Sequence, residues 1–168
     1  MEHNAKMKSM TPQELDELSV RCLLLPLHTT SLLLPNTVVA EVLDDKPVEK
    51  AANMPAWMLG MLSWRGRDVP VISFEKLLGS ETGSETAERR LVVCNTLNGN
   101  SKLPFVVLEV LGIPHLTMVT NDMLEADTGE QQHEPVVQAR LRLNEESVIV
   151  PNIDVMEKML EHLGFAVA

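Results

Sequence analysis

Short apolar runs separated by turn residues dominate the chain from residue 20 onward, which is typical of a β protein. Few of these runs alternate apolar with polar positions. Continuous apolar runs predict strands that are buried on both faces, although periodicity alone does not distinguish such a strand from a buried helix segment. The predicted strands cover residues 20–25, 31–34, 38–43, 61–64, 69–72, 91–96, 103–111, 116–119, 136–143 and 147–150.

Three short helices are predicted where capping residues meet helical spacing. Residues 11–14 read Thr-Pro-Gln-Glu, which places an N-cap hydroxyl, a proline at the first helical position and a glutamate that can bond back to the cap. Residues 73–79 begin with a capping serine and end with a glycine that can adopt the left-handed stop. The third helix is C-terminal, and its apolar stripe consists of Ile153, Met156, Leu160 and Leu163.

A six-residue frame occurs twice in the chain. Residues 69–74 (VPVISF) and 150–155 (VPNIDV) each end a predicted strand pair and open a predicted helix. The repeat indicates two related β lobes, unless short strand-to-helix junctions have converged on similar residues. Residues 79–90 contain Gly-Ser-Glu-Thr twice and no large apolar side chain, so we expect them to join the lobes. The predicted organisation is an N-terminal extension over residues 1–19 and one domain over residues 20–165.

Charge and composition narrow the classes of partner. The 168-residue chain carries a formal net charge of −10, which opposes nucleic-acid binding because that binding depends on lysine and arginine side chains. Tyrosine is absent and aromatic residues make up 3% of the chain, so platforms for base stacking are also poorly supplied. The longest apolar region, residues 22–34, is interrupted by polar residues and is too short to span a membrane. Residues 1–18 do not resemble a secretory signal, so the sequence predicts a cytoplasmic protein without direct membrane insertion.

The sequence does not predict catalysis or a metal site. The five histidines are scattered, and Cys22 and Cys94 each lie in an apolar run outside any C-x-x-C pair. No glycine-rich phosphate-binding motif occurs, so neither a nucleotide nor another cofactor is expected. Two alternatives stay open: a small hydrolase that uses Cys94 with His115 as its base, and a structural β module.

Residues 54–72 (MPAWMLGMLSWRGRDVPVI) form the most unusual stretch of the sequence. Gly66 permits a positive backbone torsion and therefore a sharp turn. Arg65 and Arg67 are then presented on a hairpin, where guanidinium groups suit bidentate pairing with the carboxylates of a partner. The alternative is that Arg65 pairs internally with an aspartate or glutamate. Trp57, beside a proline in a predicted turn, is a further candidate for a partner contact, with burial in the core as its alternative.

This stretch resembles the signature of CheW-like domains. In that signature a proline-containing turn leads to G-x-apolar-x-apolar-R-G, a short turn, P-V-I and a helical L-L-G. The wider resemblance spans residues 20–162 and includes the closing VPNIDV segment. It implies a mainly β fold of two SH3-like five-stranded β-barrels packed together. The signature is matched by Gly60, Arg65, Gly66, Pro70, Val71, Ile72, Leu77, Leu78 and Gly79.

The resemblance also implies a role without enzymatic activity. CheW-like proteins couple the cytoplasmic tip of a methyl-accepting chemoreceptor to the regulatory domain of a CheA-type histidine kinase, and other CheW-like domains are further candidate partners. Carried over by position, Arg65 and Gly66 fall where the family places part of its receptor and kinase contact region. Val38 and Val39 would lie near the same groove.

Three departures from the family pattern point to a divergent member, one of which is the lack of a clear glycine before residue 109. Glu109 stands roughly where the family commonly has aspartate, and we include it among the candidate contact residues. Residues 128–134 form an acidic, insertion-like loop. The chain is therefore similar to the accessory, ChpC-like branch that serves type IV pilus, or twitching-motility, chemosensory systems.

Overall fold

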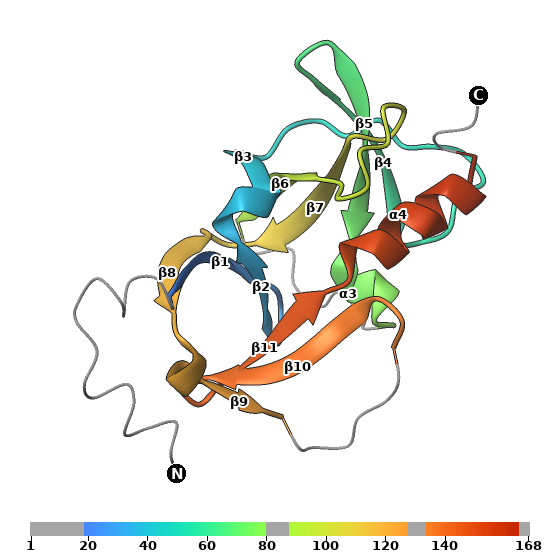
Figure 1. Ribbon diagram of the computed structural model, residues 1–168. Coiled ribbons are helices and arrows are strands. Elements are labelled where there is room, and N and C mark those ends of the chain that lie inside the picture. The colour runs from blue at the N-terminus through green and yellow to red at the C-terminus, as the bar shows by residue number, and fades with distance from the viewer. Residues whose placement is uncertain (1–18, 80–87, 128–133, 165–168) are drawn as a thin grey trace.

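The computed structural model describes residues 19–79, 88–127 and 134–164 (Figure 1). The helix predicted near residue 11 lies outside these ranges. Over the described residues the chain is mainly β, as predicted, with eleven strands in two sheets and two α-helices. Figure 1 shows the sheets as two lobes, the five-stranded sheet in the upper part of the view and the six-stranded sheet in the lower part.

Each lobe is built on one sheet. The five-stranded sheet has the order β3-β6-β7-β5-β4 and contains β3 (Val39–Leu43), β4 (Met58–Trp64), β5 (Arg67–Ser73), β6 (Arg89–Asn95) and β7 (Phe105–Leu111). The six-stranded sheet has the order β8-β1-β2-β11-β10-β9 and contains β1 (Val20–Pro26), β2 (Ser31–Pro35), β8 (His115–Val119), β9 (Leu124–Ala126), β10 (Val137–Leu143) and β11 (Glu146–Pro151).

The two sheets share one strand order. β8, β1, β2, β11 and β10 follow one another as β3, β6, β7, β5 and β4 do, and each sheet contains one parallel pair, β11 with β2 and β5 with β7. The repeated Val-Pro frames occupy matching places, because one runs from β5 into α3 (Phe74–Leu77) and the other from β11 into α4 (Ile153–His162). The prediction of two related lobes is confirmed. The three-residue β9, which the sequence analysis missed, is the sixth strand.

The prediction that residues 79–90 join the lobes is wrong. The strands on either side of them, β5 and β6, belong to the same five-stranded sheet. The chain instead passes between the sheets at η1 (Asn36–Val38) and again at residues 112–114. The physical reason is pairing: β2 bonds in parallel to β11 and β1 bonds to β8, so the first two strands complete a sheet made from the last third of the chain.

The largest hydrophobic cluster joins the two lobes. Leu25 and Ile149 enter it from the six-stranded sheet, Ile72 and Leu108 from the five-stranded sheet, and Met156 from α4. Each such fully buried side chain contributes about 1.5–3 kcal/mol through the removal of apolar surface from water. Both faces of these strands are buried, because each lobe also holds a smaller apolar cluster of its own. This explains why the strands read as continuous apolar runs.

Both predicted helices after residue 73 are present and capped. The Ser73 hydroxyl accepts a hydrogen bond from the backbone N–H of Lys76 at 3.3 Å, and the Asn152 side chain accepts one from Val155 at 3.2 Å. The buried carboxylate of Glu75 accepts a hydrogen bond from the backbone N–H of His28, which ties α3 to the turn between β1 and β2. None of the helices that the structure describes is long and apolar enough to cross a membrane.

Candidate docking site at the arginine hairpin

The hairpin between β4 and β5 turns on Arg65 and Gly66. Trp64 pairs with Arg67, which leaves a two-residue turn whose φ angles are 47° at Arg65 and 73° at Gly66. Two positive φ angles define the type I′ turn, which favours asparagine, aspartate or glycine first and glycine second. A Cβ atom at Gly66 would meet nothing within 4 Å, so the glycine serves the backbone conformation. Arginine in the first position costs about 1 kcal/mol of left-handed strain.

The side chain of Arg65 is held by two neighbours yet stays exposed. Its Nη2 lies 3.3 Å from Glu41 Oε2, and its guanidinium carbon lies 4.7 Å from the centre of the Trp64 ring. The side chain nevertheless exposes 68% of its surface. An ion pair this exposed contributes only about 0–1 kcal/mol. The internal pairing considered for Arg65 is therefore present, while most of its side chain remains exposed.

Glu41 and Trp64 form the support beneath this arginine. The indole N–H of Trp64 donates a hydrogen bond of 2.7 Å to the same Oε2 atom of Glu41 that faces Arg65. Trp64 is buried and packs edge-on against Phe105, with ring centres 4.8 Å apart. The buried ring and its hydrogen bond fix the carboxylate, and the carboxylate in turn limits where the guanidinium can lie. Nothing in the local sequence marks Glu41, because β3 reaches the β4–β5 hairpin only through the tertiary fold of the five-stranded sheet.

Arg67 completes an exposed basic tip. It begins β5 directly after the turn, where it pairs with Trp64 of β4, and its side chain is exposed. Among the residues that the structure describes it has no carboxylate partner. Arg65, Gly66 and Arg67 together form the arginine hairpin. Two guanidinium groups on a rigid turn of an acidic chain favour an anionic partner.

Val38 and Val39 lie at the start of the strand that carries Glu41. Val38 ends η1 and Val39 begins β3, an edge strand of the five-stranded sheet. Both side chains are half-buried and pack against the cluster that joins the lobes. The side chain of Asn95 donates to the backbone oxygen of Val38 at 3.2 Å, which anchors this strand start. The valines and the support of the arginine hairpin therefore share one short strand.

Trp57 and Glu109 lie at the other end of the hairpin. Both are neighbours of Ser73, the last residue of β5. The N–H of Ser73 donates a hydrogen bond to the backbone oxygen of Trp57, and Ser73 lies opposite Glu109 in the pairing of β5 with β7. Ser73 is six residues along β5 from Arg67, and at about 3.3 Å per residue this is about 20 Å. The structure therefore does not bring Trp57 or Glu109 to the arginine hairpin.

Glu109 and Trp57 both have internal contacts. Glu109 exposes 16% of its side chain and pairs with Arg89 at 3.0 Å. Arg89 also binds Asp45 at 2.7 Å and the backbone oxygen of Lys46 at 3.1 Å, so this network fastens the loop that follows β3. Trp57 is half-buried and packs against the cluster that joins the lobes.

The edge strand β8 exposes two apolar side chains that the sequence does not mark as candidates for binding. Leu116 and Met118 on β8 expose 62% and 43% of their surfaces. They pair across to Leu23 and Arg21 of β1, and β8 has no further neighbour in the described sheet. β8 takes the same place in its sheet as β3 does in the other. The alternation of apolar residues in β8 predicts a buried face, so the sequence carries no signal for this exposure.

The cysteines do not form a reactive site. Cys94 is fully buried in β6, and burial raises the pKa of its thiol to about 12, so it does not supply a thiolate near neutral pH. His115, its suggested base, is exposed on β8 of the other sheet. The pKa of the Cys22 thiol is also raised by burial. Among the described residues, acidic, histidine and cysteine side chains nowhere gather in a group of three that could hold a metal.

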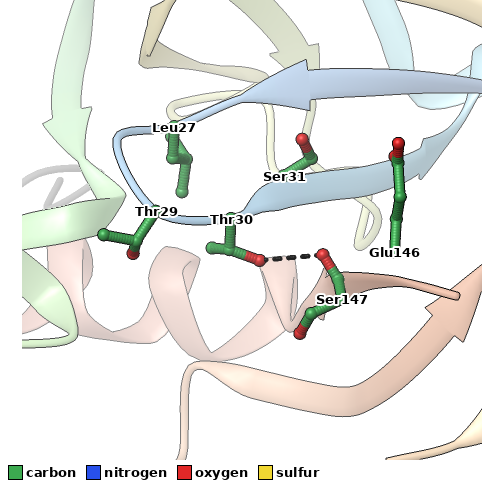
Figure 2. Close-up of a pocket in the computed structure, with 6 residues that line it drawn as sticks. All are labelled: Leu27, Thr29, Thr30, Ser31, Glu146 and Ser147. Atoms are coloured by element: carbon green, nitrogen blue, oxygen red, sulfur yellow. Dashed lines mark hydrogen bonds between the residues drawn. The ribbon is translucent and has the colours of Figure 1, made fainter.

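A polar recess lies beside the hairpin between β10 and β11. It has a volume of about 340 Å³. Figure 2 shows the Thr30 hydroxyl directed at the backbone oxygen of Ser147, to which it donates a hydrogen bond of 3.1 Å. The lining side chains supply hydroxyl groups and one carboxylate, without an imidazole or thiol, so no activated nucleophile is assembled. The recess is lined by Leu27, Thr29, Thr30, Ser31, Glu146 and Ser147.

The described part of the chain thus consists of two packed β lobes that carry an exposed basic hairpin, and both cysteines are buried. Comparison with known proteins identifies the family: the model of the CheW-like domain matches residues 21–161, so the chain belongs to the CheW-like family. CheW-like proteins are coupling proteins of chemosensory signalling without catalytic activity, and this chain is one of them. The search of curated proteins found no match.

A solved structure supports the fold. The chain is similar to the scaffolding protein TtCheW from Thermoanaerobacter tengcongensis, with a TM-score of 0.66 and 18% sequence identity. The similarity covers 79% of this chain and 88% of that one. At this level of identity the likeness concerns the arrangement of the two lobes, which agrees with the predicted pair of barrels.

Proposed function

We propose that this chain couples the cytoplasmic tip of a chemoreceptor to the regulatory domain of a CheA-type histidine kinase, and that the arginine hairpin is a docking surface for these partners. One observation carries the proposal: Arg65 keeps a φ of 47° at a turn position that favours asparagine, and exposes 68% of its side chain there. Strained residues persist where function retains them. We also place the protein in the cytoplasm, where both partners present these domains.

The chemistry of the arginine hairpin suits an acidic partner surface. Arg65 can exchange its weak pair with Glu41 for a partner carboxylate at little cost, because the present pair is solvent-exposed. Arg67 adds a second set of donors beside it. Bidentate arginine–carboxylate pairs combine charge with a fixed geometry, so they select orientation as well as sign.

The exposed apolar residues suit a helical partner. Leu116 and Met118 stand on β8, and Leu23 beside Leu116 packs against the cluster that joins the lobes. An amphipathic helix of a receptor tip buries one apolar face when it docks on such a strip. Val38 and Val39, at the edge of the other sheet, extend the same proposal to the second lobe.

The finer placement in the ChpC-like, type IV pilus branch is also a proposal. It is supported by glutamate in place of aspartate at residue 109 and by the acidic residues 128–134, of which the structure describes Glu134, paired with Arg140 at 2.7 Å. Other CheW-like domains are further candidate partners in the same array. Crosslinking in the cell, followed by identification of the captured kinase and receptor, tests the branch.

The docking proposal is tested by charge reversal with a matched control. Arg65→Glu should weaken binding to the purified kinase regulatory domain or to a receptor-tip fragment at least about tenfold, since loss of a charge-assisted hydrogen bond costs about 1.5–3 kcal/mol. Arg142→Glu, an exposed arginine near the tip of the other hairpin, is the control and should bind as the unaltered chain does. Unchanged affinity of Arg65→Glu for both partners would refute the assignment.

A further inference from the structure

The loop between β6 and β7 carries the only Asn-Gly pair in the sequence, Asn98-Gly99. Asn98 is exposed, and Gly99 has a φ of 65° with open space where a Cβ would lie. Asparagine before glycine is chemically labile, because the unhindered backbone nitrogen of glycine can reach the side-chain carbonyl carbon of asparagine. This property of the loop is independent of the docking function.

The side chain of Asn98 fastens the loop to α4. Its amide nitrogen donates one hydrogen bond of 2.9 Å to Asp154 Oδ1 and another of 2.6 Å to Glu157 Oε2, which uses both of its hydrogens. Asn100 makes a third link, donating to Glu161 Oε1 at 3.1 Å. The three acidic residues follow one face of α4, while Met156 and Leu160 on the same helix enter the cluster that joins the lobes.

Glu157 depends on Asn98 more than its neighbours do. The residue is 2% exposed, and its Oε1 atom has no hydrogen-bond partner among the residues that the structure describes. The amide of Asn98 is therefore the one donor seen for this carboxylate in the described part of the chain. A buried carboxylate with a single donor is poorly compensated, so loss of that donor leaves it without a partner.

We propose that Asn98 is a site of spontaneous deamidation, and that the product releases α4 from the loop. The backbone nitrogen of Gly99 attacks Cγ of Asn98, a C–N bond forms, and the side-chain nitrogen leaves as ammonia. Water then opens the resulting five-membered imide, giving aspartate or isoaspartate at position 98. An amide that donates two hydrogen bonds is thereby replaced by a carboxylate that donates none.

The product acts on the helix through charge. The new carboxylate faces Asp154 and Glu157 at hydrogen-bond distance, so three like charges meet and the buried one loses its donor. The contact with α4 in turn affects the rate of deamidation. While α4 is docked, its two carboxylates hold the Asn98 amide nitrogen and oppose its departure. The contact between the loop and α4 therefore slows deamidation. After deamidation, residue 98 can no longer donate the two hydrogen bonds that held the loop to α4.

Ageing of the intact chain tests the chemical step. The full-length protein is incubated in mildly alkaline buffer, digested, and assayed by peptide mass spectrometry and isoaspartate labelling. Aspartate and isoaspartate should accumulate at position 98 several-fold faster than at Asn144, an exposed asparagine followed by glutamate. Gly99→Ala, whose added Cβ meets nothing within 4 Å, should suppress it. Equal rates at the two asparagines, or no effect of Gly99→Ala, overturns the proposal.

Hydrogen exchange of α4 tests the structural consequence. The amides of α4 should exchange several-fold faster in aged than in fresh protein, and faster in Asn98→Asp than in Asn100→Asp, where the facing Glu161 is exposed. The double variant Asn98→Asp with Glu157→Gln restores a donor to the pair and should recover slow exchange. Exchange in the aged protein that stays at the fresh rate refutes the release of α4, whether or not Asn98→Asp folds.

Discussion

Arg65 and Asn144 occupy the same position in the two lobes. Each is the first of two residues in a hairpin turn, with φ angles of 47° and 48°, and each is followed by a second residue of positive φ, Gly66 in one lobe and Glu145 in the other. Asparagine suits this position and arginine does not. At the first turn position the unfavourable residue therefore lies in the lobe whose tip is basic, whereas the other lobe has its unfavourable residue, Glu145, at the second position.

Exchange at these two positions should have unequal effects on stability. Asn144→Arg introduces left-handed strain without a carboxylate and indole to receive the side chain, so it should lower the free energy of unfolding by about 1 kcal/mol. Arg65→Asn removes similar strain but also an exposed ion pair and a cation–π contact of about 0.5–1 kcal/mol, and should change stability by less than about 1 kcal/mol. Urea denaturation measures both, and equal losses would contradict this account.

The second turn position gives a prediction of the opposite sign. Glu145→Gly should raise the free energy of unfolding by roughly 1 kcal/mol, because glycine adopts the φ of 75° without strain. Gly66→Ala is the matched reversal and should lower stability by a similar amount, since no atom lies within 4 Å of the new Cβ. A stabilising Gly66→Ala would show that this turn does not need a positive φ.

Gly60→Ala should be far more damaging than Gly66→Ala. A Cβ atom at Gly60 would lie 2.1 Å from the backbone oxygen of Glu49, at a φ of 147°. Glu49 and Met61 bridge there through two backbone hydrogen bonds, so neither chain can move without losing them. We expect a loss of at least about 2 kcal/mol, measured by denaturant unfolding. A loss no larger than that of Gly66→Ala would mean that the two segments can separate at little cost.

The Arg89 network predicts a difference between two adjacent arginines. Arg89→Ala leaves the largely buried carboxylate of Glu109 without its partner and removes the contacts that hold the loop after β3. It should lower the free energy of unfolding by about 1–3 kcal/mol. Arg90→Ala removes pairs only with the exposed Asp44 and Glu88 and should cost less than about 1 kcal/mol. Thermal unfolding of the two variants compares them, and equal costs would mean that Glu109 is not held by Arg89.

The thiol of Cys94 predicts a loss of stability at alkaline pH. Its pKa is about 12 in the folded chain and near 9.0 when exposed, so above pH 9 the unfolded state binds fewer protons than the folded state. Stability should therefore fall as the pH rises from 9 toward 12, and this component should be missing in Cys94→Ala. Native protein should also resist alkylation at Cys94, whereas fast labelling near neutral pH would revive the hydrolase alternative.

The sequence alone predicted most of the local structure. Continuous apolar runs mark strands that are buried on both faces, Ser73 and the residues before α4 mark helix starts, and Arg65-Gly66 mark a sharp hairpin. Each of these depends on properties of neighbouring residues, which a sequence states directly. The order of residues from Gly60 to Gly79 also sufficed to suggest the family that the comparison then identified.

Only the tertiary structure decided which strands meet. Continuous apolar runs do not encode a face or a register, so nothing in them pairs β2 with β11 or assigns β5 and β6, the strands on either side of residues 80–87, to the same sheet. For the same reason the sequence did not place Glu41 under Arg65, did not pair Glu109 with Arg89, and did not leave Leu116 exposed on an edge. These contacts join residues far apart in the chain, and they exist because long-range strand pairing, rather than local preference, sets what each side chain faces.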